Sequence, residues 1–176
     1  MWDMRIALCS GYEMKISESR KVRITEEVGR GAGCIVYDAI YWDQMKIKHK
    51  IRVKECYPAY LRLNRDSTGD LQPSSSNPAK FEEAKERFTD AYKRNTDIRN
   101  TLGLTNSTVN AVDVISCNHT VYILMPMDEG CDYKHYEDQS LQELFGHMKS
   151  LAQIIQKYHQ NRYLHLDIKP ENVMLA

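Results

Sequence analysis

Near its end the chain reads His165-Leu166-Asp167-Ile168-Lys169-Pro170-Glu171-Asn172-Val173, and this stretch decides the fold. It carries a carboxylate at Asp167, an ammonium at Lys169 and an amide at Asn172. Phosphoryl transfer from a nucleotide to a hydroxyl needs these groups: one to orient the attacking oxygen, a cation for the transferring phosphate and a metal ligand. The stretch therefore predicts phosphoryl-transfer chemistry.

Length and composition fit one folded domain. The chain has 176 residues, enough to bury a core. Lys+Arg and Asp+Glu each total 24, so the net charge gives no reason to expect binding to nucleic acid or to an anionic membrane. Hydrophobic residues make up 42% of the sequence, and no apolar run approaches the roughly 18 residues that a membrane-spanning helix needs.

The cysteines are odd in number and form no C-x-x-C pair. This pattern argues against a disulfide framework or a zinc site, and it favours the reducing cytoplasm. They are Cys9, Cys34, Cys56, Cys117 and Cys131.

Hydrophobic periodicity predicts an alternation of strands and helices after an unassigned segment at residues 1–20. We expect strands at 21–28, 34–42 and 47–56, a loop at 63–77, a strand hairpin at 111–116 and 120–125, and a connector at 126–139. One helix begins at Asn77-Pro78 and ends at Leu102-Gly103, with a break possible at residues 95–97. A second helix opens with the capping-box spacing of Ser140 and Glu143.

A glycine segment lies between the first two predicted strands and reads Gly29-Arg30-Gly31-Ala32-Gly33-Cys34-Ile35-Val36. Glycines there let the backbone approach phosphates closely, although a flexible hairpin turn explains a lone glycine cluster equally well. Lys54 on the next strand adds weight, because a buried lysine needs an anionic partner. Taken alone, Lys54 is equally well explained as a solvated lysine on a strand that carries several other basic residues.

In these three places the sequence resembles the eukaryotic-like serine/threonine protein kinases. Residues 165–172 resemble their catalytic loop, Gly29, Gly31 and Val36 their glycine-rich loop, and Lys54 the lysine of the third strand. The stretch Val53-Lys54-Glu55-Cys56-Tyr57-Pro58 is similar to bacterial members in particular.

The resemblance implies an α+β, protein kinase-like fold. We expect an N-terminal extension (residues 1–20) and an N-lobe with hinge (21–127), built on a five-stranded antiparallel sheet with one long helix. Residues 128–176 would form the first helices and the catalytic loop of a truncated helical C-lobe.

The resemblance also implies roles for single residues, with ATP and Mg²⁺ as cofactors and a protein bearing serine or threonine as substrate. Asp167 would accept the proton of the substrate hydroxyl, Lys169 would neutralise the γ-phosphate, and Asn172 would bind magnesium. Lys54 would pair with the α- and β-phosphates. The residues that would surround the nucleotide are Gly29, Gly31, Gly33, Val36, Met125 as gatekeeper, and Met127 in the hinge.

Several positions depart from the family pattern. Leu166 replaces an arginine that would dock a phosphorylated activation loop, so control by loop phosphorylation is not expected. Arg52 replaces a small residue above the adenine, and it shares a strand face with Lys54. Cys34 takes the place of the third glycine.

The sequence does not decide which acidic residue would pair with Lys54. Asp90 is the first choice and Glu86 the second, and a position on a solvated helix surface explains either one equally well.

Only four residues follow Asn172. We therefore expect an incomplete catalytic domain that transfers phosphate poorly by itself. The apolar stripe Leu144, Met148, Leu151 and Ile155 would lack its covering helices, which predicts self-association or a partner chain on helix 140–160. The alternative to a kinase is a pseudokinase or scaffold module without catalysis. A small-molecule phosphotransferase is disfavoured by Lys169.

Overall fold

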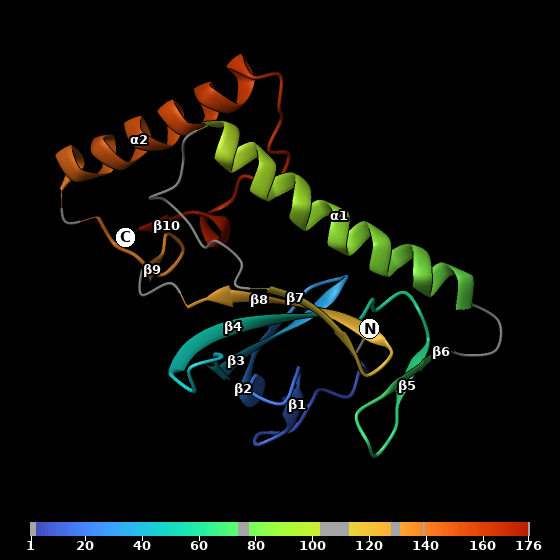
Figure 1. The fold of residues 1–176 in the computed structure, drawn as a ribbon. Helices are drawn as coiled ribbons and strands as arrows, with labels where there is room; N and C mark the ends of the chain where they lie inside the picture. The colour runs from blue at the N-terminus through green and yellow to red at the C-terminus, as the bar shows by residue number, and fades with distance from the viewer. Residues whose placement is uncertain (1–2, 74–77, 103–112, 128–130, 139, 176) are drawn as a thin grey trace. The chain divides into compact units, whose positions relative to one another are not determined.

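The computed structural model describes residues 3–73, 78–102, 113–127, 131–138 and 140–175, with only the backbone of Asn95, Arg99, Cys131 and Met174. The chain divides into two compact units. Unit 1 comprises Met1–Asn95 and Val109–Met127, and unit 2 comprises Thr96–Thr108 and Asp128–Ala176. Figure 1 labels the elements of both units.

Unit 1 is built on a six-stranded antiparallel sheet in the order β1-β2-β3-β4-β8-β7. The strands are β1 (Glu13–Lys15), β2 (Lys21–Arg30), β3 (Cys34–Trp42), β4 (Lys48–Cys56), β7 (Asp113–Cys117) and β8 (Thr120–Pro126). The expected five-stranded sheet is corrected to six, because β1 arises from the segment that had no assignment. Met14 of β1 is buried in the core, and Glu13 forms ion pairs with Lys21 and Arg23 of β2.

The two central strands, β3 and β4, alternate between the core and the opposite face, β4 in its second half. Ile35, Tyr37, Ala39 and Tyr41 of β3 are buried, while the residues between them are half-buried. On β4 Ile51, Val53 and Glu55 alternate into the core, so a carboxylate takes a core position, and Cys56 at the end of the strand is buried as well. The opposite face of β4 presents Arg52 and Lys54.

The predicted hairpin at residues 111–125 is confirmed for its described part, residues 113–125, and β8 continues to Pro126. Its turn places Asn118 and His119 at φ of 52° and 57°, the left-handed geometry that two-residue hairpin turns require.

The segment predicted as a loop at residues 63–77 contains a short hairpin, β5 (Leu63–Arg65) and β6 (Leu71–Pro73). Its turn explains the misleading composition: Gly69 has a φ of 98°, and the Asp66 carboxylate accepts the backbone N–H groups of Thr68 and Asp70. Leu63 and Leu71 are nevertheless buried in the core cluster. The segment holds more polar, turn-forming residues than strand residues, so its composition predicted a loop and concealed β5 and β6.

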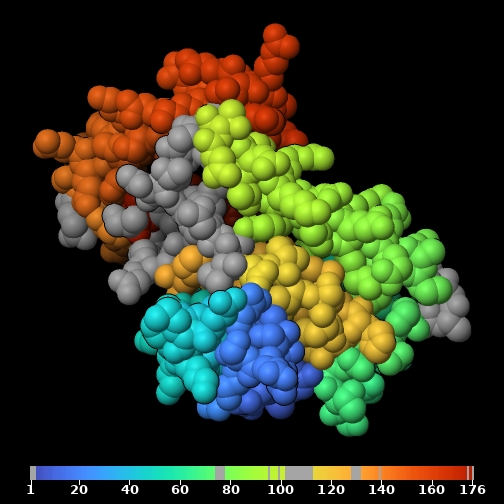
Figure 2. Space-filling model, viewed as in Figure 1, coloured from blue at the N-terminus to red at the C-terminus, as the bar shows by residue number. Residues whose placement is uncertain are grey.

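Helix α1 (Pro78–Leu102) confirms the predicted first helix. The expected break at residues 95–97 is wrong, since the backbone stays helical there. Asn, Thr and Asp each cost only some tenths of a kcal/mol in a helix interior, which neighbouring turns offset. Asn77 and Gly103, its predicted capping residues, lie outside the described residues. Phe81 and Ala84 anchor the first half of the helix in the core of unit 1, and in space-filling view this half lies beside β7 and β8 (Figure 2).

Unit 2 contains α2 (Leu141–Gln160), the 3₁₀ turn η1 (Pro170–Asn172) and two short strands, β9 (Cys131–Asp132) and β10 (Met174–Leu175). The predicted N-cap is confirmed, because the Ser140 hydroxyl accepts the backbone N–H of Glu143 at 3.2 Å. Several helices were expected here, but the described part of unit 2 holds one α-helix beyond the end of α1. Of the apolar stripe predicted to be uncovered, Met148 is exposed, whereas Leu144, Leu151 and Ile155 are half-buried. Leu141 and Phe145 of α2 are also exposed.

No helix in the described ranges combines the length and the apolar character needed to cross a membrane.

Candidate functional site

The loop before β10 brings three predicted site residues together. The Asn172 amide donates from Nδ2 to the Asp167 backbone oxygen at 2.9 Å and to its carboxylate Oδ2 at 2.7 Å. The Lys169 ammonium lies 3.4 Å from the other carboxylate oxygen of Asp167. A carboxylate, an ammonium and an amide therefore form one cluster, and all three side chains are exposed to solvent.

Local sequence explains this convergence. Lys169 is extended and precedes Pro170, whose fixed φ starts the 3₁₀ turn η1. The turn closes when the Asn172 N–H donates to the Lys169 carbonyl at 2.9 Å, which directs Asn172 back toward Asp167. Leu166 has a φ of 63°, an uncommon left-handed geometry for a leucine, and its side chain is 87% exposed. The chain thus reverses on both sides of Asp167.

The loop is held by neighbouring parts of unit 2. The His165 ring packs edge-on against Tyr158 of α2, with 5.8 Å between the ring centroids, which matches a bracing role for this histidine. Glu171 forms an ion pair with Lys134 at 3.1 Å, and the Tyr133 N–H donates to the Val173 carbonyl at 2.8 Å. A backbone hydrogen bond, and then the hydrogen bond from Lys134, lowers the pKa of Glu171, so this carboxylate stays charged beside the cluster.

The oxygen atoms of the cluster are of the kind that magnesium accepts as ligands. Asn172 uses its amide nitrogen toward Asp167, so its oxygen is the atom left for a cation. Magnesium in phosphoryl-transfer sites takes one or two protein oxygen ligands and completes its shell with phosphate and water. Within the described ranges no group of three or more His, Cys, Asp or Glu residues could hold a metal by itself.

In unit 1 the glycine-rich turn, Lys54 and Val36 occupy one face of the sheet. Gly31 donates its N–H to the Cys34 carbonyl at 2.9 Å, which closes the turn between β2 and β3. Val36 lies directly opposite Lys54 across β3 and β4, and Gly29 lies opposite Val36 across β2 and β3.

The three glycines of this turn are required neither by backbone angle nor by packing. None has a positive φ. A Cβ atom added at Gly29 or Gly33 would meet no atom within 4 Å, and one added at Gly31 would meet the Cys34 Sγ at an ordinary 3.6 Å. Open space therefore lies beside this turn, as close approach of a ligand to the backbone would require.

Arg52 has a partner on the same face. Its Nε donates to the Asp38 carboxylate at 3.1 Å across β3 and β4. The pair is half-buried and lies next to the Val36–Lys54 pair. Met125 of β8 lies opposite Arg52, and Met127 follows the end of β8; both are half-buried. The resemblance implies a hinge at Pro126 to Asp128 with Gly130 following it, and both Asp128 and Gly130 lie outside the described residues.

The two acids proposed as partners of Lys54 lie elsewhere. Asp90 is 3.8 Å from Lys93 on α1, and Glu86 lines a shallow groove between α1 and the β7–β8 hairpin. Over the part of the chain that the structure describes, no carboxylate comes within ion-pair distance of Lys54. Neither Asp90 nor Glu86 therefore pairs with Lys54 in this structure.

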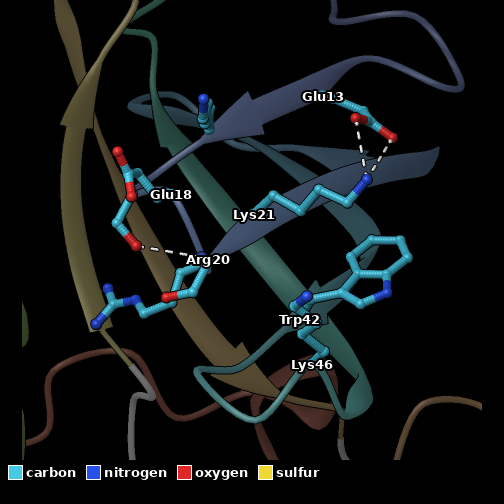
Figure 3. A pocket seen from close by; sticks show the side chains of 9 residues that line it. Glu13, Glu18, Arg20, Lys21, Trp42 and Lys46 are labelled. Carbon is cyan, nitrogen blue, oxygen red and sulfur yellow. Dashed lines mark hydrogen bonds and ion pairs between the residues drawn. The ribbon is translucent and has the colours of Figure 1, made fainter.

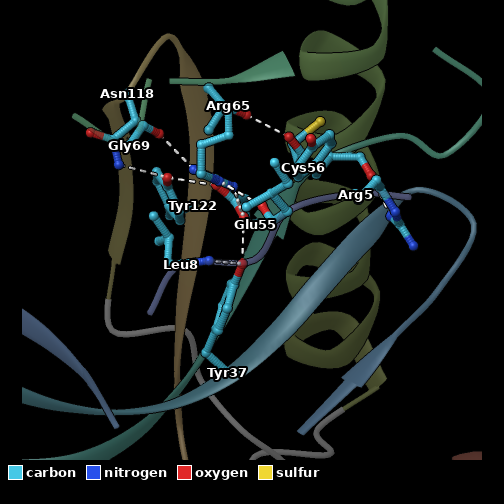
Figure 4. Close-up of polar contacts among 12 residues, drawn as sticks. Arg5, Leu8, Tyr37, Glu55, Cys56, Arg65, Gly69, Asn118 and Tyr122 are labelled. Carbon is cyan, nitrogen blue, oxygen red and sulfur yellow. Dashed lines mark hydrogen bonds and ion pairs between the residues drawn. The ribbon is translucent and has the colours of Figure 1, made fainter. Parts of the chain in front are cut away.

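The residue after Lys54 has a role that the sequence reasoning missed. Glu55 is fully buried, and its carboxylate accepts three hydrogen bonds of 2.7 Å, from the hydroxyls of Tyr37 and Tyr122 and from the Arg65 guanidinium (Figure 4). Burial, and then the charge of Glu55, raises the pKa of both tyrosines far above its ordinary value. Strand periodicity alone could have placed Glu55 in the core, but it could not name the partners.

The N-terminal segment reaches the glycine-rich turn through Arg5. This side chain is almost buried and donates to the carbonyls of Gly31 at 2.9 Å, of Cys34 at 3.2 Å and of Tyr57. Asp3 forms an ion pair with Arg5 at 2.5 Å and so balances its charge. Hydrogen bonds from Arg5 thus hold the turn in place, and Arg5 lies in the segment 1–20 for which the sequence predicted no element.

A separate hollow on unit 1 is lined by β1, β2 and the end of β3 (Figure 3). Lys21 lies 3.3 Å from Glu13 and 4.7 Å from the centre of the Trp42 ring. None of the predicted site residues lines this hollow.

Comparison with known proteins finds similarity to solved structures. No family model matches the chain, and no curated protein matches it. Among solved structures, the chain is similar to the PpkA-294 apo form, a bacterial serine/threonine kinase fragment, with a TM-score of 0.65 and 23% sequence identity. The similarity covers 96% of this chain and 57% of that chain. The fold is therefore kinase-like, and the chain spans little more than half the length of this solved neighbour.

Proposed function

We propose that this chain is the nucleotide-binding and catalytic-loop part of a protein serine/threonine kinase that uses Mg-ATP. The observation that carries the proposal is the cluster of Asp167, Lys169 and Asn172, in which the Lys169 ammonium and the Asn172 amide both contact the Asp167 carboxylate. The kinase-like fold of the chain supports it.

In this proposal Asp167 orients the hydroxyl of a serine or threonine and accepts its proton. Lys169, held 3.4 Å from Asp167, neutralises charge that develops on the transferring phosphoryl group. Asn172 supplies its amide oxygen to the magnesium ion that accompanies ATP. Catalysis of this kind depends on position and electrostatics and requires no covalent intermediate.

The nucleotide would lie against the open side of the glycine-rich turn, with Lys54 on its α- and β-phosphates and Val36, Met125 and Met127 near the base. Gly29, Gly31 and Gly33 have room for a phosphate on that side. Lys54 has no carboxylate partner in the described ranges, so its charge is available to an anion.

A pseudokinase is the second candidate, and two observations favour it. The Arg52–Asp38 pair occupies the sheet face where the adenine would lie, and Lys54 lacks the helix acid that active kinases use. For either candidate we propose a cytoplasmic location, on the grounds that the four cysteines whose side chains are described are all free thiols.

Thermal unfolding with Mg-ATP tests the proposal. At 100 times its dissociation constant, the nucleotide should stabilise the chain by about 2.7 kcal/mol, or roughly 5–10 °C. Lys54→Ala should abolish the shift, whereas Lys50→Ala, an exposed lysine on the same strand, should retain it. A shift that survives Lys54→Ala would refute the assignment of the site, and no shift in the unmodified chain would favour a scaffold.

A further inference from the structure

Cys34 and Cys56 lie directly opposite each other in the sheet. Cys34 is the first residue of β3, Cys56 is the last residue of β4, and the antiparallel register pairs them. Both are free thiols. Cys34 directly follows the glycine-rich turn, and Cys56 lies two residues after Lys54.

Hydrogen bonding shows which kind of cross-strand pair they form. The Tyr57 N–H donates to the Gly33 carbonyl at 3.0 Å, so Gly33 and Tyr57 are a hydrogen-bonded pair. Pairs alternate along an antiparallel ladder, which makes the next one, Cys34 and Cys56, a pair without mutual hydrogen bonds.

The carbonyl contacts agree. The Cys34 carbonyl accepts from Gly31 and Arg5, and the Cys56 carbonyl accepts from the Thr120 hydroxyl at 2.6 Å, so both turn away from the opposing strand.

A pair of this kind has the Cα separation that a disulfide needs. Pairs without mutual hydrogen bonds bring opposed Cα atoms to about 4.5 Å and their side chains closest together. Disulfides accept Cα separations of about 4.4–6.8 Å. The two side chains also share a face, because the residues that alternate with them, Ile35 and Glu55, both point into the core.

We propose that Cys34 and Cys56 form a reversible disulfide when the protein meets a peroxide. The Cys34 sulfur attacks one peroxide oxygen and becomes a sulfenic acid, releasing water after proton transfer. The Cys56 thiol then attacks the Cys34 sulfur, forms the S–S bond and displaces the hydroxyl, which leaves as a second water with the Cys56 proton. Two thiols are oxidised and one peroxide is reduced, and a dithiol reverses the step.

Burial assigns the order of the two thiols. Cys56 is 1% exposed, and burial raises the pKa of its thiol to about 12, with the adjacent Cys34 adding to the rise. Cys34 is half-buried and is the one that a peroxide reaches. Cys34 is therefore the residue oxidised first, and Cys56 is the resolving thiol.

The bond would tie the glycine-rich turn to the strand that carries Lys54. If the proposed function holds, this link restricts the turn that must cover the phosphates, so oxidation weakens nucleotide binding. Such transient disulfides are the kind found in reducing compartments.

Peptide mapping tests the bond. Folded protein is treated with hydrogen peroxide, its remaining thiols are alkylated, and it is digested with trypsin. Cleavage after Arg30, Lys46, Lys54 and Arg62 places Cys34 in residues 31–46 and Cys56 in residues 55–62, each with no other cysteine. We expect these two peptides to be joined in most molecules, and separated again by dithiothreitol.

Variants and an unfolded control sharpen the result. Cys34→Ser should remove the cross-link and leave Cys56 alkylatable, while Cys9→Ser, at an exposed cysteine elsewhere, should leave it intact. In denaturant the preference for this pair should disappear. Oxidation of Cys34 to a sulfinic acid, or its pairing with another cysteine while Cys56 stays free, would overturn the proposal.

The nucleotide arm separates the two hypotheses. We expect at least a tenfold loss of Mg-ATP affinity on oxidation, absent in Cys34→Ser and reversed by dithiothreitol. A disulfide that forms without changing affinity would overturn the link to the turn. Reduced protein that never binds Mg-ATP would refute the proposed function and leave the mapped bond as evidence for the disulfide.

Discussion

At the scale of single residues, the fully buried carboxylate of Glu55 has a large energetic consequence. Taking a carboxylate out of water costs several kcal/mol unless it is paired and hydrogen-bonded. Here Arg65 supplies the opposite charge, and Tyr37 and Tyr122 supply two further donors. Removing Arg65 would leave the Glu55 carboxylate buried without an opposite charge.

Arg65→Ala should therefore destabilise the fold by about 3–5 kcal/mol. Urea unfolding measures the loss. The matched control is Arg87→Ala, because Arg87 pairs with Glu83 on the exposed face of α1, where an ion pair contributes about 0–1 kcal/mol. Similar losses in the two variants would contradict the view that burial gives the Glu55–Arg65 pair its weight.

Several surface carboxyls predict how stability depends on pH. Hydrogen bonds from Arg5 hold the pKa of Asp3 below its usual range, and hydrogen bonds from Arg30 and Thr68 do the same for Glu27 and Asp66. A carboxyl with a lowered folded pKa binds fewer protons folded than unfolded, so it stabilises the fold above its unfolded pKa of about 4.

Unfolding temperatures should therefore stay level down to about pH 5 and fall steadily below about pH 4, as these groups take up protons. Asp3→Asn should make the decline shallower, since one of the titrating groups is removed. Differential scanning calorimetry from pH 7 to pH 2.5 makes the comparison. A rise in stability on acidification would contradict the sign of these pKa shifts.

At the scale of elements, each part of the candidate site depends on how one turn or helix begins. The glycine-rich turn is closed by its own hydrogen bond and held by Arg5, and η1 begins at a proline that aims Asn172. Helix α2 begins after Ser140, whose hydroxyl caps its first turn. Met148 of the predicted apolar stripe is exposed, but Leu144, Leu151 and Ile155 are half-buried, so self-association through this face stays a prediction.

Ser140→Ala should lower the stability of unit 2 by about 1 kcal/mol, because a backbone N–H of the first turn loses its acceptor. The matched control is Ser150→Ala, an exposed serine within α2, which should be neutral or slightly stabilising since alanine is the better helix former. Hydrogen exchange of the α2 amides reports the effect locally. Equal protection in both variants would show that the cap does not stabilise the helix.

At the scale of the whole molecule, the residues of the proposed site are divided between the two units. Lys54 and the glycine-rich turn lie in unit 1, and Asp167, Lys169 and Asn172 lie in unit 2. The proposed function requires both groups of residues to act on one nucleotide, and this stays a prediction with a direct test.

Asn172→Ala should remove most of the magnesium dependence of ATP binding while leaving binding of metal-free ATP unchanged, because only the metal ligand is lost. Calorimetric titration with and without magnesium measures both affinities. Asn161→Ala, at the C-terminal end of α2, controls for effects on unit 2 in general. If Asn172→Ala leaves the magnesium dependence intact, the two groups of residues do not share one nucleotide.

The sequence by itself determined the parts that depend on near neighbours. Alternation defined β3 and β4, apolar spacing defined α1 and α2, and the Asp167–Asn172 contact spans only five residues. Such contacts need little loop closure, so the local pattern is enough to specify them.

Only the tertiary structure decided the contacts between distant segments. It joined β1 to the sheet, gave Glu55 its partners Arg65 and Tyr122, and set Cys34 opposite Cys56. It also placed Asp90 and Glu86 away from Lys54. These choices follow from strand register and from burial that many segments share, and a single stretch of sequence cannot encode which distant group will meet it.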